Sequence, residues 1–179
     1  MRIEILKNKK LRGELNFGGF RLKNKNKKTP LVSIIMPNFK SKTLKKAIQS
    51  ILKQTYKNFE LIIIDGSSGK STINILKKFD NKIDFWISER DKGMWDAWNK
   101  GFKLAKGRFV GIVDSSNVLY PNAMKILAKY IKKNPKIDFV CGTVIKDKKI
   151  LGGYNPEKIY RKFNIIRSSV VGFFIKKKS

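Results

Sequence analysis

Residues 59–69 read Phe59-Glu60-Leu61-Ile62-Ile63-Ile64-Asp65-Gly66-Ser67-Ser68-Gly69, a nearly unbroken apolar run that ends in a polar, glycine-rich turn. A continuous apolar run of this length is typical of a strand covered on both faces, as in a parallel sheet with helices on each side. Similar runs occupy residues 31–36, 83–88, 109–113 and 137–141. Segments with helical periodicity separate them, at residues 44–52, 71–79, 94–106 and 121–133. This alternation predicts an α/β fold with a mostly parallel sheet flanked by helices.

The turns that follow the predicted strands are expected to form a ligand site, because parallel strands end at one edge of the sheet and ligands bind beyond that edge. The turns are residues 37–38, 65–69, 89–93 and 114–117, and all but the first carry an Asp at or near the end of the strand. Seven of the 13 acidic residues lie between residues 65 and 114, in a chain with 41 Lys+Arg.

The composition excludes several classes of protein. The chain has 179 residues and no His, which excludes a Ser-His-Asp triad and a His-based metal site. Its length fits one domain. A single cysteine, Cys141, allows no internal disulfide and fits a reducing compartment. No apolar run approaches the roughly 20 residues of a membrane span, so the sequence predicts a cytoplasmic protein.

The formal charge of +28 raises nucleic acid and anionic membranes as partners. Most of the basic residues are Lys, spread over predicted helix surfaces, whereas base and phosphate recognition favours Arg. We therefore expect no dedicated nucleic-acid site and interpret the charge as a lysine-rich surface. Peripheral contact with an anionic membrane remains an open alternative.

Each candidate turn has a functional and a structural interpretation. The Asp65 carboxylate can accept a hydrogen bond from a nucleobase or ribose, or it can cap the next helix. Asp91 precedes a helix, and a carboxylate at that position stabilises the helix N-terminus. The oxygen-bearing side chains of Asp114-Ser115-Ser116-Asn117 suit Mg²⁺ or Mn²⁺ bound to a diphosphate, or an Asx turn.

Taken in order, four segments resemble glycosyltransferase family 2, whose members have a Rossmann-like GT-A fold. The resemblance covers about residues 18–145 and is carried by Leu31–Phe39, Ser50–Tyr56, Ile62–Gly66 and Ser88–Gly101. It implies transfer of a sugar from a nucleotide-diphosphate-sugar donor to an acceptor hydroxyl. The acceptor would be a glycan or a lipid-linked sugar, as in polysaccharide synthesis.

The resemblance also implies roles for individual residues. Donor-binding residues would be Pro37, Asn38, Phe39, Asp65, Asp91, Lys92, Gly93 and Asn99. Asp114 and Asn117 would occupy the place of the family's metal motif and hold Mg²⁺ or Mn²⁺. The implied division of the chain is a basic extension at 1–29, a nucleotide-sugar-binding core at 30–145 and a partial acceptor region at 146–179.

Two departures from the family pattern concern the metal and the base. The metal motif ends in Asn117, whose amide brings no charge to a cation. No Asp or Glu follows Glu157, so the family's general base has no matching position and the chain is expected to be truncated at its acceptor half. The alternatives are a homologue that binds nucleotide sugar without turnover, and a basic protein that binds nucleic acid or an anionic surface.

Overall fold

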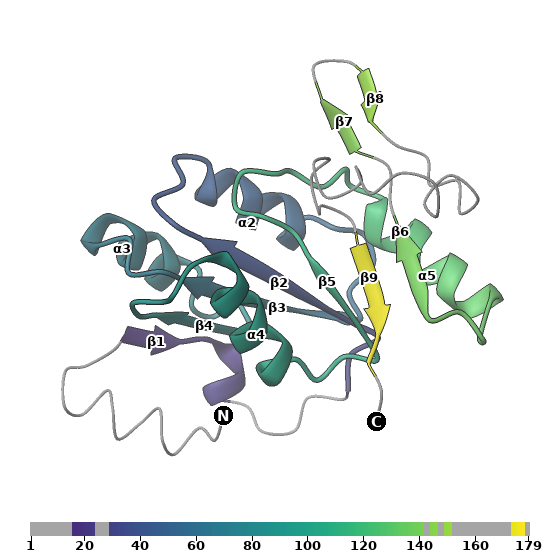
Figure 1. Cartoon of the computed structure of the whole chain (residues 1–179), viewed down its shortest axis with the longest axis horizontal. Coiled ribbons are helices and arrows are strands. Elements are labelled where there is room, and N and C mark those ends of the chain that lie inside the picture. The colour runs from purple at the N-terminus through teal and green to yellow at the C-terminus, as the bar shows by residue number, and fades with distance from the viewer. Residues whose placement is uncertain (1–15, 24–28, 142–143, 147–148, 152–172, 178–179) are drawn as a thin grey trace.

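The apolar runs pair side by side as the central strands of one sheet in the computed structural model, which describes residues 16–23, 29–141, 144–146, 149–151 and 173–177 (Figure 1). The strand order is β1-β4-β3-β2-β5-β9-β6. The strands are β1 (Asn16–Gly18), β2 (Val32–Asn38), β3 (Phe59–Asp65), β4 (Phe85–Ser88), β5 (Phe109–Ile112), β6 (Phe139–Cys141) and β9 (Phe173–Lys176). A separate pair joins β7 (Val144–Lys146) to β8 (Lys149–Leu151).

The centre of the sheet is parallel. β4, β3, β2 and β5 run side by side in the same direction. β2 and β3 pair along their whole length, with Val32 opposite Phe59 and Asn38 opposite Asp65. The predicted α/β fold with a central parallel sheet is therefore confirmed, and the four strand ends meet at one edge.

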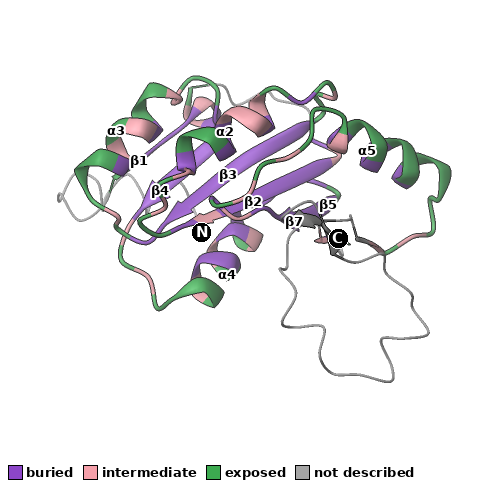
Figure 2. Cartoon of the chain, turned by 90° about the horizontal axis from the view of Figure 1, so that it is seen from above, coloured by how far each residue is buried: buried purple, intermediate pink, exposed green. Residues whose placement is uncertain are grey.

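Helices cover both faces of this sheet (Figures 1 and 2). One face packs on α2 (Leu44–Leu52), α3 (Lys70–Lys78) and α5 (Ala123–Lys133), and the other on α4 (Met94–Leu104). Strands β2 and β3 are buried from end to end apart from Pro37, which is half-buried. Burial on both faces explains why these strands carry apolar residues at nearly every position instead of alternating ones.

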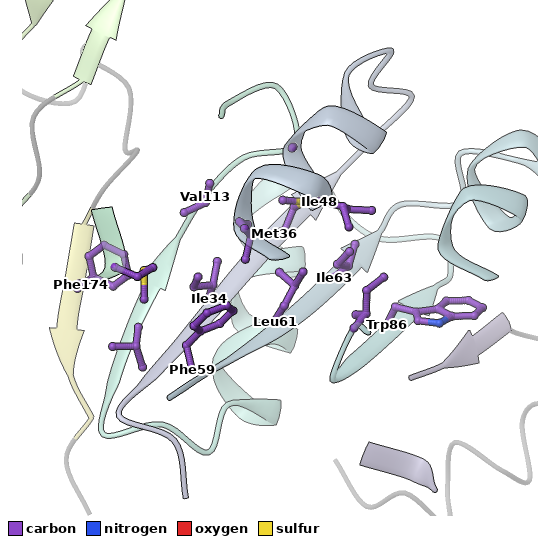
Figure 3. Packing of buried hydrophobic residues seen from close by; sticks show 14 of the residues in the cluster. Ile34, Met36, Ile48, Phe59, Leu61, Ile63, Trp86, Val113 and Phe174 are labelled. Carbon is purple, nitrogen blue, oxygen red and sulfur yellow. The ribbon is translucent and has the colours of Figure 1, made fainter. Parts of the chain in front are cut away.

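Successive residues of the central strands point to opposite faces of the sheet, so their side chains pack in two separate hydrophobic clusters. Ile34 and Met36 face α2 and α5 together with Leu61 and Ile63 (Figure 3). Ile35 belongs to the opposite cluster, against α4. Each fully buried aliphatic side chain of this kind stabilises the fold by about 1.5–3 kcal/mol relative to an exposed one.

Residues 16–22, which lie in the predicted basic extension at 1–29, pack against the edge of the sheet. β1 pairs antiparallel with β4, and the 3-10 helix η1 (Phe20–Leu22) follows it. The buried Arg21 lies 3.1 Å from Glu60 Oε2 and donates to the Leu104 carbonyl at 3.0 Å. A three-residue strand that contains Gly18 has no apolar run, so it leaves no periodic signal in the sequence.

β9 also departs from the simple alternation of strands and helices. It inserts between β5 and β6 and runs antiparallel to both. Most of the predicted acceptor region, residues 152–172, lies outside the described residues, as do residues 1–15. The division of the chain at residues 29/30 and 145/146 stays a prediction.

Candidate donor-binding site

A cavity of about 700 Å³ lies where β2, β3, β4 and β5 end. Its walls are the turns that follow these strands, as expected for a parallel sheet. Residues of the predicted donor and metal sites that line it are Pro37, Asn38, Phe39, Asp91, Gly93 and Asp114. The sheet thus brings together side chains that are up to about 80 positions apart in the sequence.

Asp65 is fully buried and is not among the residues that line this cavity. Its Oδ1 accepts from Asn38 Nδ2 at 2.6 Å and from the Ser68 hydroxyl. Its Oδ2 accepts from the Ser88 hydroxyl at 2.6 Å and from the Ser68 amide at 3.0 Å. Both carboxylate oxygens are thus occupied by protein donors. Asp65 ties the turn after β3 to the ends of β2 and β4.

Asn38 is held in one orientation by this pairing, because only its amide nitrogen can donate to the Asp65 carboxylate. The side chain is buried beside the cavity. Its Oδ1 has no hydrogen-bond partner among the described residues. An acceptor in this state is costly to leave unpaired, by about 1–3 kcal/mol.

The turn after β4 places Asp91 between the cavity and α4. Asp91 Oδ1 accepts from the Gly93 amide at 3.0 Å. Gly93 has a φ of 100°, which favours glycine. A Cβ built on Gly66 would lie 2.9 Å from Asp91 Oδ2, so a larger residue at this position would displace the Asp91 side chain.

Lys100 holds the same turn from the α4 side. Its Nζ lies 2.9 Å from Glu89 Oε1 and 3.1 Å from Asp96 Oδ2. Burial lowers the pKa of Lys100, but the two carboxylates outweigh burial and the net pKa is raised. The hydrogen bonds from the Lys92 amide and from Lys100 lower the pKa of Asp96. These ion pairs fix where α4 begins.

Lys92 and Asn99 are exposed and are not among the cavity-lining residues. The Lys92 amide donates to Asp96 at 3.1 Å, which is a structural role at the helix start. Contact of these two side chains with a donor stays a prediction.

The predicted metal site is split by the structure. Asp114 lines the cavity, whereas Asn117 does not. The side-chain amide nitrogen of Asn117 donates to the Ser116 hydroxyl at 3.4 Å. Burial raises the pKa of Asp114, since the half-buried carboxylate has lost water without gaining a cation. Within the described ranges, no three His, Cys, Asp or Glu side chains are grouped as metal ligands.

These residues do not fit a protein-made Mg²⁺ or Mn²⁺ site. Divalent cations of this kind are held by one or two carboxylates together with the phosphates of the substrate. At the end of β5 the described residues that line the cavity offer one carboxylate, Asp114, so a cation there would depend on the phosphates of the donor for its other charged ligands.

Sequence reasoning missed part of the cavity wall. Four residues that line it lie in the predicted turns but were given no individual role: Gly66, Ser67, Arg90 and Ser115. Lys40, Met94 and Ala97 also line it and lie outside those turns, within three positions of a predicted donor-binding residue, so extending each motif along the chain would have found them. Phe39 and Met94 are 65% and 49% exposed, which leaves apolar surface at the rim for a planar ligand.

Known proteins resemble this chain over most of its described length. Residues 33–177 match the family described as Glycosyl transferase family 2. The chain is 36% identical over 134 residues to UDP-Glc:alpha-D-GlcNAc-diphosphoundecaprenol beta-1,3-glucosyltransferase WfgD of Escherichia coli, covering 72% of this chain and 53% of that protein. It is 32% identical over 146 residues to poly(ribitol-phosphate) beta-N-acetylglucosaminyltransferase TarP of Staphylococcus aureus, covering 78% of this chain and 44% of that protein.

Solved structures share the fold. S. aureus TarS 1-349 in complex with UDP-GlcNAc superposes with a TM-score of 0.61 at 22% identity, over 81% of this chain and 45% of that one. The mannosyltransferase PcManGT from Pyrobaculum calidifontis in complex with GDP-Man and Mn²⁺ gives a TM-score of 0.57 at 19% identity, over 75% and 38%. The expected GT-A fold is confirmed.

The chain spans about half the length of the curated relatives that it matches. The family match covers most of the sheet and the cavity described above, from Ser33 in β2 to the end of the described residues. On this evidence the chain belongs to glycosyl transferase family 2.

Proposed function

We propose that this chain is the donor-binding part of a glycosyltransferase that uses a nucleotide-diphosphate sugar. The observation that carries the proposal is the 700 Å³ cavity at the strand ends, lined by Asn38, Asp91 and Asp114 in a family 2 chain. Sites for small molecules occupy about 300–1,000 Å³, so the cavity has a suitable size. WfgD and TarP are named as transferases of glucose and N-acetylglucosamine, which supports a hexose-type donor.

The base of the donor would lie against Pro37, Asn38 and Phe39. Phe39 offers an exposed ring for stacking, and the unpaired Asn38 Oδ1 offers an acceptor beside it. Asp65 would act through Asn38, since it fixes the amide and does not line the cavity. Asp91 and Gly93 would lie against the ribose or the sugar.

The reaction would join an acceptor hydroxyl oxygen to the anomeric carbon of the sugar. The bond from that carbon to the diphosphate would break, and the nucleoside diphosphate would leave with the bonding electrons. The hydroxyl proton would pass to a carboxylate base. No described residue is assigned as that base. A glycan or lipid-linked acceptor is proposed from the names of WfgD and TarP.

A second proposal is binding without turnover. It is favoured by Asn117, which stands where the resemblance implies an acidic metal ligand. Hydrolysis of UDP-glucose or UDP-GlcNAc, followed by release of UDP, separates the two proposals. Hydrolysis by the wild type that is lost in Asp91→Ala supports the enzyme. Nucleotide binding without hydrolysis, with or without Mn²⁺, supports the binding protein, and no binding contradicts both.

Contact with a membrane would be peripheral in this proposal. No helix in the described part of the chain is long and apolar enough to cross a bilayer. The net charge of +28 favours an anionic lipid surface, where a lipid-linked acceptor would be found. Cosedimentation with lipid vesicles tests this. We expect the protein to sediment with anionic vesicles and to stay in solution with neutral ones. A cytoplasmic location stays part of the proposal.

A further inference from the structure

The acidic residues of the cavity stand on different sides of it. Asp91 Oδ2 lies next to Gly66, at the end of β3. Asp114 follows β5, and β2 separates β3 from β5. Neighbouring strands are about 4.8 Å apart, so the backbone at these two places is separated by roughly 10 Å. The end of β5 therefore contributes one carboxylate to the cavity wall, that of Asp114, and the turn after β4 contributes the other.

Two cations line the same cavity. Lys40 follows β2 and Arg90 follows β4, and both side chains are exposed. Neither has an acidic partner within the described ranges, and the Lys40 ammonium lies 5.1 Å from the centre of the Phe39 ring. Lys100 differs in this respect, because Glu89 and Asp96 already neutralise it. Lys40 and Arg90 thus bring two free positive charges to the mouth of the site.

The backbone at Lys40 is held in a conformation that non-glycine residues rarely adopt. Lys40 has a φ of 51°, and Ser67 has a φ of 62°. Both are cavity-lining residues, and in the described part of the chain they are the only non-glycine residues with positive φ. The Lys40 amide donates at 2.8 Å to the Ser68 hydroxyl, which donates to Asp65. Strained backbone supported in this way is typical of ligand-binding turns.

From these observations we propose that Lys40 and Arg90 bind the diphosphate of the donor and supply the positive charge that a divalent metal supplies elsewhere. The inference rests on the proposed function and adds the group that holds the diphosphate. The diphosphate of a nucleotide sugar carries about two negative charges and that of free UDP about three, and Arg and Lys are the side chains that bind phosphate by charge-assisted hydrogen bonds. The cations reach the site from β2 and β4, on either side of β3.

Calorimetric titrations with UDP, UMP and uridine test this, each in EDTA and in Mn²⁺. GDP and GMP are run in parallel because the base is not assigned. The variants are Lys40→Gln and Arg90→Gln, whose side chains are exposed and support no described contact of the core. The matched controls are Lys42→Gln, which is exposed and outside the cavity wall, and Arg108→Gln, at the opposite end of β5.

We expect the wild type to bind UDP about equally well, within threefold, in EDTA and in Mn²⁺. Each cavity variant is expected to weaken UDP about tenfold, UMP less and uridine not at all. The two controls leave all three unchanged. UDP binding that requires Mn²⁺, or an unchanged preference for UDP over uridine in both cavity variants, would overturn this inference alone. Failure of every nucleotide to bind in either buffer would overturn the proposed function, and this inference with it.

Discussion

Asn38 and Asp65 face each other at the ends of neighbouring strands, with the Asn38 amide 2.6 Å from Asp65 Oδ1. This pair joins the fold to the site, because Asn38 lines the cavity and Asp65 lies behind it. Asp65 also accepts from Ser68 and Ser88, so one carboxylate orders the ends of three strands. We therefore separate residues that shape the site from residues that touch a ligand.

Replacing Asp65 by Ala is expected to lower the free energy of unfolding by about 3 kcal/mol, because several buried donors lose their acceptor. Urea denaturation measures this. Asp91→Ala is the matched variant, since Asp91 is only half-buried and its contact in the turn is local. It should change stability by less than about 1 kcal/mol while weakening nucleotide binding. Equal stability of Asp65→Ala and the wild type would contradict the role assigned to Asp65.

Gly101 marks the closest approach of α4 to the sheet. A Cβ built there would lie 2.4 Å from Ile35 Cγ2, so Gly101→Ala is expected to push α4 away and to cost about 1–3 kcal/mol despite the better helix propensity of Ala. Since α4 begins at the cavity, nucleotide affinity should fall as well. Lys103→Ala, on the exposed face of the same helix, is the control. A Gly101→Ala protein that is more stable than the wild type would show that α4 does not pack as described.

Arg21 and Glu60 form a buried ion pair at 3.1 Å between η1 and β3. Glu60 also accepts from the Ser33 hydroxyl and the Lys106 amide, both at 2.6 Å. Arg21→Leu leaves a buried carboxylate without its cation and is expected to cost about 3–5 kcal/mol. A double-mutant cycle with Glu60→Leu should recover part of that loss. Additive losses in the cycle would contradict direct coupling of the two residues.

Asp80 gives the N-terminal segment a pH dependence. Burial alone raises the pKa of Asp80, but hydrogen bonds from Trp86, Lys23 and the Gly19 amide outweigh it and bring the pKa below 3.8. A lowered pKa means that the ionised carboxylate stabilises the fold at pH values above its pKa in the unfolded protein. This stabilisation is lost as the pH falls through its pKa in the folded protein. The stability difference between wild type and Asp80→Ala should therefore be constant from pH 5 to 7 and shrink below about pH 4. A difference that persists unchanged at pH 2.5 would contradict this assignment.

The core of the fold was predictable from the sequence because its strands are long and continuously apolar. The apolar run at residues 59–64 is typical of a doubly covered strand, and the turn at Asp65 followed from it. β1 was not predictable, since its three residues contain Gly18 and form no apolar run. The place of β9 between β5 and β6 depends on these distant partners, which no local pattern reveals.

The sequence predicted the location of the site better than it predicted the roles of the individual residues. The strand ends brought Asn38, Asp91 and Asp114 together as the topology required. Burial of Asp65 depends on donors from three turns, which no local pattern reveals. Lys40 and Arg90 were given no role from the sequence, because a single cation in so basic a chain carries little information.

Chemical-shift mapping with ¹⁵N-labelled protein and UDP tests the central claim most directly, since it locates the nucleotide without requiring turnover. We predict that the largest amide shifts fall on Gly66, Ser67, Gly93 and Ser115, from the turns around the cavity. A second, smaller cavity lies beside β1 and is lined by Phe17 and Trp86, whose amide shifts should stay unchanged. Saturable shifts centred on that second cavity or on α5, with none at the strand ends, would contradict the assignment of the donor site.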